Sequence, residues 1–132
     1  MTPLTGGCLC GSVRYQSATP AVRSTLCHCA TCRRASGSSA QGWVTVLKND
    51  FHFTTAPPAA YRSSKSVTRT FCAICGTPLT YCHADWAAEI AFSIGSMDTP
   101  NEAPPSDHIW MSEAIAWDKP ADGLRQYGTD RP

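Results

Sequence analysis

The cysteines between residues 27 and 32 form the part of this sequence best suited to chemistry. Cys27, Cys29 and Cys32 follow a Cys-x-Cys-x-x-Cys pattern, with His28 between the first two. Neither a core nor a turn needs so many sulfur ligands close together, whereas thiolates at this spacing can surround one soft metal ion. Zn²⁺ is the usual ion for such ligands, so we predict a zinc site at these three cysteines.

Two further cysteine pairs supply ligands for a second site. One residue separates Cys8 from Cys10 and two separate Cys72 from Cys75, so seven of the eight cysteines fall in three tight groups. A structural zinc site usually takes four protein ligands, whereas a catalytic site usually takes three and keeps one position open. The simplest division joins the two pairs in a closed structural site and leaves the group from 27 to 32 as an open site.

Spacing also permits a second division of the cysteines. Cys29 and Cys32 can pair with the knuckle of Cys72 and Cys75, as in a zinc ribbon. The remaining thiols would then form another closed site: Cys8, Cys10, Cys27 and Cys82. That arrangement leaves no open position for chemistry. In the first division Cys82 is predicted to be a small, buried apolar side chain, and His28 is predicted to point away from the metal.

Composition limits the classes of partner and compartment. The 132 residues predict a single domain, 1–132, and the net charge of +1 lacks the basic excess typical of duplex-binding domains, so a nucleic-acid partner is not expected. Arg62, Lys65 and Arg69 are interpreted as a solvated face.

No secretory signal or membrane-length apolar run is visible, which favours a cytoplasmic protein without a membrane partner. Disulfides are rare there, so metal binding is favoured for the cysteines. The sequence carries no signal for an oligomeric state.

The hydrophobic pattern predicts a mainly β fold, with about seven to nine short strands and no long amphipathic helix. We expect the segment 41–48 to form a hairpin with 51–53, because Asn49 and Asp50 are turn-forming residues. The alternation of residues from 61 to 71 is treated as one strand. Further strands are expected at 13–15, 22–27, 79–81, 89–94 and within 108–117, followed by an irregular tail.

With their neighbours, the cysteine motifs resemble the glutathione-dependent formaldehyde-activating enzyme family, which also includes centromere protein V. The matching segments are 7–15, 27–37 and 71–79, with a C-terminal pattern at His108-Ile109-Trp110, Trp117 and Gly123-Leu124. The resemblance implies a mainly β, Mss4-like fold, also described as a β-tent. It implies two zinc ions per chain. The structural ion would bind Cys8, Cys10, Cys72 and Cys75, and the catalytic ion Cys27, Cys29 and Cys32.

The resemblance also implies an activity and its small-molecule partners. The family joins glutathione to formaldehyde, giving S-(hydroxymethyl)glutathione, and is classed with the carbon–sulfur lyases.

Zinc with three thiolates is a weaker Lewis acid than zinc with three histidines, so it suits binding a substrate thiol better than activating water. Arg33 and Arg34 follow the last ligand directly, and we predict that they bind a carboxylate of the thiol. Trp43, Trp110 and Trp117 are candidates for a pocket wall.

Three other functions stay open at this point. The chain would also suit a non-catalytic zinc-binding module for a protein or nucleic-acid partner. A lyase or isomerase acting on a different thiol adduct would need the same open site. A redox thiol switch would instead leave thiols free to react.

Overall fold

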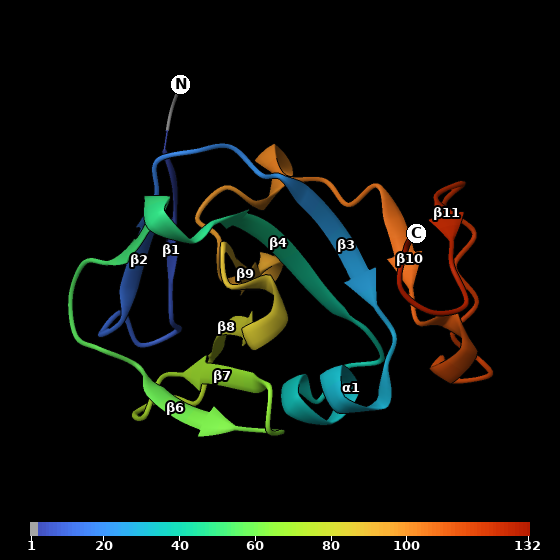
Figure 1. The fold of residues 1–132 in the computed structure, drawn as a ribbon, viewed down its shortest axis with the longest axis horizontal. Coiled ribbons are helices and arrows are strands. Elements are labelled where there is room, and N and C mark those ends of the chain that lie inside the picture. The colour runs from blue at the N-terminus through green and yellow to red at the C-terminus, as the bar shows by residue number, and fades with distance from the viewer. Residues whose placement is uncertain (1–2) are drawn as a thin grey trace.

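The computed structural model describes residues 3–132, which form two β-sheets and one short α-helix (Figure 1). The smaller sheet has the order β1-β2-β5, with bounds Leu4–Gly7, Arg14–Ser17 and Phe51–Phe53. The larger sheet has the order β11-β10-β3-β4-β9-β8-β7-β6. In that order its strands are Arg125–Gln126, Asp107–Ile109, Arg23–Cys27, Gln41–Leu47, Glu89–Ser93, Pro78–His83, Val67–Phe71 and Ala59–Arg62. The prediction of a mainly β fold is confirmed.

Helical structure is limited to the connections. Helix α1 covers Ala30–Ser36 and joins β3 to β4. The 3-10 turns are η1 (Lys48–Asp50), η2 (Ala84–Trp86), η3 (Ile94–Ser96), η4 (Pro100–Glu102) and η5 (Met111–Glu113). In Figure 1 the blue strands β1 and β2 lie at the opposite side of the molecule from β10 and β11, and α1 lies at the end of β3.

Strand β4 separates the two buried regions of the molecule. Its aromatic and β-branched residues favour a strand, and it pairs with β3 on one side and β9 on the other. Because successive side chains point to opposite faces, Val44 and Val46 join the main core with Tyr15 and Phe51 of the smaller sheet. Trp43 points the other way and packs with Cys27. The smaller sheet therefore covers one face of the larger sheet, and the 27–32 cysteines lie at the other.

Two strand predictions were wrong. Segment 51–53 does not form a hairpin with 41–47, because β4 is already paired on both edges; β5 pairs with β2 instead. Turn η1 carries the chain from one sheet to the other. The alternation from 61 to 71 divides into β6 and β7, which pair antiparallel. The polar residues between them form a turn in which Val67 N–H donates to Ser64 O (3.4 Å).

Tyr15 lies at the centre of the main core and depends on a glycine beside it. Its ring lies 5.4 Å from that of Phe51 and 4.9 Å from that of Phe92, measured between ring centroids. Its hydroxyl is 2.7 Å from the Ser96 hydroxyl. A Cβ at Gly6 would lie 2.3 Å from the Tyr15 hydroxyl and 2.5 Å from the Ser96 carbonyl oxygen. Only glycine lets β1 approach the ring so closely.

We therefore predict that Gly6→Ala lowers the free energy of unfolding by about 1–3 kcal/mol, because the added methyl overpacks the core. Urea unfolding measures the change. Gly95→Ala is the control, since a Cβ there meets no atom within 4 Å, and it should change stability by less than about 0.5 kcal/mol. Equal stability of the two variants would contradict the close approach.

Candidate metal centres

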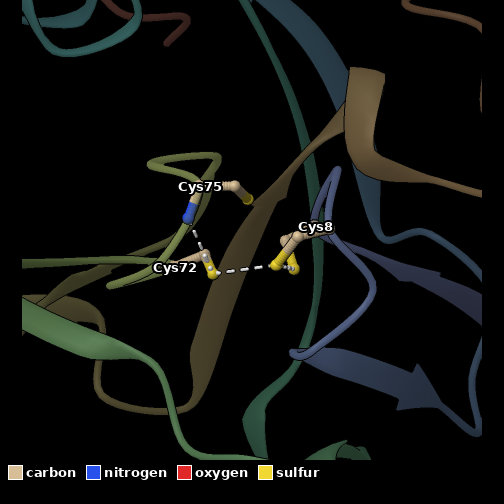
Figure 2. A group of neighbouring side chains, drawn as sticks. Cys8, Cys72 and Cys75 are labelled. Atoms are coloured by element: carbon tan, nitrogen blue, oxygen red, sulfur yellow. Dashed lines mark hydrogen bonds between the residues drawn. The ribbon is translucent and has the colours of Figure 1, made fainter.

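Four cysteines from two separate turns bring their sulfur atoms together. Cys8 and Cys10 lie between β1 and β2, and Cys72 and Cys75 lie between β7 and β8. Their four sulfurs all lie within 4.8 Å of one another. Figure 2 shows the Cys8, Cys72 and Cys75 side chains pointing inward from the two turns. Because one turn belongs to each sheet, this four-cysteine group joins the two sheets.

Each turn closes around its sulfur atoms with a glycine in the left-handed backbone region. Gly11 and Gly76 both have a φ of +83°, which costs glycine little and most other residues much more. Gly11 N–H donates to Cys8 O (3.1 Å), and Gly76 N–H donates to Cys72 O (2.9 Å). The two turns are therefore similar knuckles that present their thiols to the same point.

Backbone donors stabilise negative charge on these sulfurs. Val13 N–H lies 3.3 Å from Cys8 Sγ, and Cys75 N–H lies 3.4 Å from Cys72 Sγ. Burial opposes ionisation of Cys8, but hydrogen bonds outweigh it and lower its pKa to about 7. The Thr77 hydroxyl, with further hydrogen bonds, lowers the pKa of Cys75 to about 5. Metal ligands must be deprotonated, so these two lowered pKa values, together with four sulfurs at one point, fit a metal such as Zn²⁺.

The second group is formed by β3 and the helix that follows it. Cys27 ends β3, Cys29 is the N-cap of α1, and Cys32 lies in the first turn of α1. Their sulfurs lie within 4.8 Å of one another. Within residues 3–132 this group contains three possible ligands, against four in the first group. Cys29 Sγ accepts a hydrogen bond from Cys32 N–H at 3.3 Å, so the helix start holds the loop in place.

Crowding of the three thiols shifts their ionisation. Hydrogen bonds from Cys27 and then Cys32 lower the pKa of Cys29. The contacts with Cys29 and Cys32, together with burial, raise the pKa of Cys27. Three thiolates at such short separation repel one another. A divalent cation among them would remove that repulsion, so this group also fits a metal ion.

A cavity opens at the three-cysteine group. It has a volume of about 280 Å³, and all three cysteines line it. Aromatic residues form much of its remaining wall: Trp43, Tyr81, Trp86 and Trp110. Trp117, the third tryptophan expected as a pocket wall, is 74% exposed and does not line this cavity. The open side of this group therefore faces a cavity with largely apolar walls.

The remaining cysteine and histidine candidates lie outside both groups. Cys82 is half-buried and packs against the main core. His28 is 1% exposed, and its Nε2 is 2.9 Å from His108 Nδ1. No disulfide joins any of the eight cysteines. The structure thus groups the cysteines as in the simplest division, with Cys82 apart from both groups and His28 bonded to His108.

The two arginines expected to bind the substrate, Arg33 and Arg34, do not line the 280 Å³ cavity at the three-cysteine group. Arg34 lines a second cavity of about 540 Å³, beside α1 and the β6–β7 hairpin. Arg33 is half-buried, and its Nε has no hydrogen-bond partner.

Arg69 of β7 lines both cavities, although it was not among the predicted site residues. Its Nη2 lies 3.8 Å from Cys32 Sγ, and its guanidinium carbon lies 5.1 Å from the centroid of the Tyr81 ring. From the alternation of side chains along residues 61–71, Arg69 was predicted to lie on a solvated face of a strand. Its pairing with Tyr81 across β7 and β8 brings it to the cysteines, and nothing in the local sequence indicates that pairing.

A model of the family described as glutathione-dependent formaldehyde-activating enzyme matches residues 3–113. The chain belongs to this family. Its description is that of an enzyme family, and the fold of its members is Mss4-like, as the resemblance implied. No curated protein matches the chain.

A crystal structure of a Rhodobacter sphaeroides protein, a structural genomics target, has a similar fold. Its TM-score is 0.60 at 16% sequence identity, over 93% of this chain and 98% of that chain. At this identity the likeness shows the fold alone. Within the described residues, no helix has the length and apolar character needed to span a membrane.

We predict that the two cysteine groups respond differently to substitution. Cys72→Ser should lower the melting temperature by roughly 10 °C or more, because its group joins the two sheets and metal binding contributes to folding. We predict that the original protein binds two zinc ions and that Cys29→Ser binds one, with a much smaller change in melting temperature. Metal analysis by mass spectrometry and thermal unfolding measure both effects.

Cys82→Ser is the matched control, because Cys82 belongs to neither group. It should keep both zinc ions. If Cys72→Ser and Cys29→Ser also keep two ions and melt like the original protein, the grouping of ligands is wrong.

Proposed function

We propose that the protein is a zinc-dependent carbon–sulfur lyase that joins a thiol, glutathione, to formaldehyde or a related aldehyde. The observation that supports this best is the three-cysteine group facing a 280 Å³ cavity, in a chain of this family. In this proposal Cys27, Cys29 and Cys32 hold a catalytic zinc ion, and the four-cysteine group holds a structural one. A zinc ion with three thiolate ligands supplies a soft Lewis acid that favours ionisation of a substrate thiol.

The proposed reaction is an addition and needs no oxidant or reductant. The thiol sulfur forms a bond to the carbonyl carbon, the carbonyl π-electrons move to oxygen, and the proton lost by the thiol ends on that oxygen. The product is a hydroxymethyl thioether when the aldehyde is formaldehyde. Breakdown of the adduct is the same step in reverse. The protein has to bring the two reactants together and orient them, which lowers the entropic part of the barrier.

The cavity wall suits this role because most of it is apolar. Trp43 and Tyr81 lie with ring centroids 5.8 Å apart beside the cysteines. Ile109 continues the wall. Such a surface limits the water that competes with the thiol for the aldehyde. It also provides the apolar contacts that ligand sites combine with a few polar groups.

A carboxylate on the thiol would find a cationic partner in Arg69. Among the described residues no carboxylate lies within ion-pairing distance of Arg69, whereas Arg23 pairs with Glu89. The 540 Å³ cavity contains Arg34 and Arg69 in its wall and no acidic residue. Thr31, Trp43 and Arg69 line both cavities, so they lie at the border between them. We propose that the thiol group lies in the first cavity and the carboxylate-bearing part extends into the second.

The zinc-loaded protein should accelerate exchange between free formaldehyde and its glutathione adduct, which nuclear magnetic resonance can follow with ¹³C-labelled formaldehyde. Cys29→Ser should lose the acceleration because it removes one of the three sulfurs. Cys82→Ser should keep it. Absence of any acceleration by the original protein, with both zinc ions bound, would contradict the proposed reaction.

Substitution of Arg69 tests the binding of the carboxylate. Arg69→Met should raise the KM for glutathione roughly tenfold with little change in kcat, because it removes a charge-assisted contact made equally to substrate and transition state. The KM for 2-mercaptoethanol, a thiol without a carboxylate, should stay the same.

Arg62→Met is the control, since Arg62 is exposed and lines neither cavity. It should leave both KM values unchanged. If Arg69→Met raised the KM for glutathione and the KM for 2-mercaptoethanol equally, Arg69 would not be the partner of the carboxylate.

A further inference from the structure

Trp110 has a backbone conformation that is unusual for a bulky residue. Its φ is 58° and its ψ is 38°, and it is the only non-glycine residue with a positive φ in the part of the chain that the structure describes. The left-handed region brings Cβ close to the following carbonyl oxygen, so an aromatic residue there is strained. Such strain persists only where surrounding contacts impose it, and it concentrates at functional sites.

A C-terminal strap, residues 125–131, imposes this conformation. Trp110 N–H donates to Thr129 O at 3.0 Å, and Met111 N–H donates to Tyr127 O at 3.0 Å. Arg125 begins β11, which pairs in parallel with β10 immediately before Trp110. At its other end the strap is fixed by Arg131, whose Nε and Nη2 lie 2.9 Å and 2.7 Å from the Asp107 carboxylate oxygens. The strap lies beyond residue 113, where the family match ends.

The turn that contains Trp110 is also fixed to the cysteine loop. Glu113 Oε1 accepts a hydrogen bond from Ala30 N–H at 2.9 Å, at the start of α1. His28 N–H donates to Ile109 O at 3.0 Å. Between these contacts the half-buried Trp110 side chain packs against the apolar cluster around Cys27 and lines the 280 Å³ cavity. The backbone around Trp110 is therefore held from both sides, and its side chain lies at the wall of the site.

We infer that Trp110 determines specificity by limiting the size of the carbonyl compound that reaches the three-cysteine group. The inference rests on the proposed function, because it concerns the second reactant at that site. Ordinary packing of the wall does not require a left-handed backbone, since the preceding residue, Ile109, lines the same cavity without one. A rigid indole in this place narrows the cavity beside the cysteines. Formaldehyde, with no substituent larger than hydrogen, would be the aldehyde least hindered by it.

A matched pair of variants distinguishes the backbone strain at Trp110 from the role of its indole in the cavity wall. Trp110→Ala and Trp110→Gly both remove the indole, but alanine keeps the steric penalty of the left-handed region and glycine does not. Trp110→Gly should therefore melt at a higher temperature than Trp110→Ala. Equal melting, or the reverse order, would overturn the claim that the strap holds this residue in a strained conformation.

Both variants should show the same change in specificity despite their different stability. The ratio of kcat/KM for propionaldehyde to kcat/KM for formaldehyde, with glutathione as the thiol, should rise roughly tenfold or more in each. This ratio should rise less in Trp110→Phe, because phenylalanine keeps an aromatic side chain in the cavity wall. Trp117→Ala is the control for loss of a tryptophan, since Trp117 is exposed away from the cavity. An unchanged ratio in both small variants would overturn the inference.

The rate of zinc removal by a chelator does not depend on catalysis, so it tests this inference separately from the proposed reaction. Removal of the more labile zinc by 1,10-phenanthroline should be roughly tenfold faster in Trp110→Ala and Trp110→Gly, and unchanged in Trp117→Ala, because the wall also restricts a bulky chelator. Faster removal without any thiol–aldehyde activity in the original protein would support the wall and contradict the proposed function. Activity in the original protein with unchanged removal and an unchanged aldehyde ratio would support the function and overturn the role of Trp110.

Discussion

The contact between two cysteine knuckles from different sheets is the constraint on which the rest of the structure depends. Cys8 and Cys10 enter from the smaller sheet, and Cys72 and Cys75 enter from the larger one. Four sulfurs within 4.8 Å of one another would repel as thiolates, and a cation among them would remove that repulsion, so the group could hold a metal ion. Ligands more than sixty residues apart in the sequence are thereby fixed together. With the main core between the sheets, this fixes how the smaller sheet lies over β4.

That packing leaves the opposite face of β4 available for the second cysteine group. Val44 and Val46 are buried on the side of the smaller sheet, whereas Trp43 and Thr45 line the cavity. The two groups therefore differ in surroundings as well as in the number of ligands. One lies between turns of two sheets, and the other has three sulfurs beside a cavity. This difference supports the assignment of a structural role to the first and of chemistry to the second.

Local spacing predicted the cysteine groups because zinc ligands within one knuckle must be close in sequence. Counting ligands favoured the division that the structure shows, although spacing alone also allowed Cys29 and Cys32 to join the other knuckle. The mainly β fold followed from short alternating segments without a long amphipathic helix. The C-terminal pattern at residues 108–110 was recognised through the family resemblance, and Trp110 was also a candidate for a pocket wall. These features depend on short stretches of sequence or on a pattern shared by a family.

Features that depend on pairing between distant strands were not predictable in the same way. Arg69 reaches the cavity because β7 pairs with β8, and Phe51 joins the smaller sheet because both edges of β4 are occupied. The left-handed conformation of Trp110 depends on hydrogen bonds that this turn donates to carbonyl groups of the strap, 17 to 19 residues beyond Trp110. Zinc-edge X-ray absorption before and after addition of glutathione tests the central claim, that one cysteine group is a ligand short, most directly. The mean number of sulfur neighbours per zinc ion should rise with glutathione, whereas an unchanged number at saturating glutathione would contradict the account.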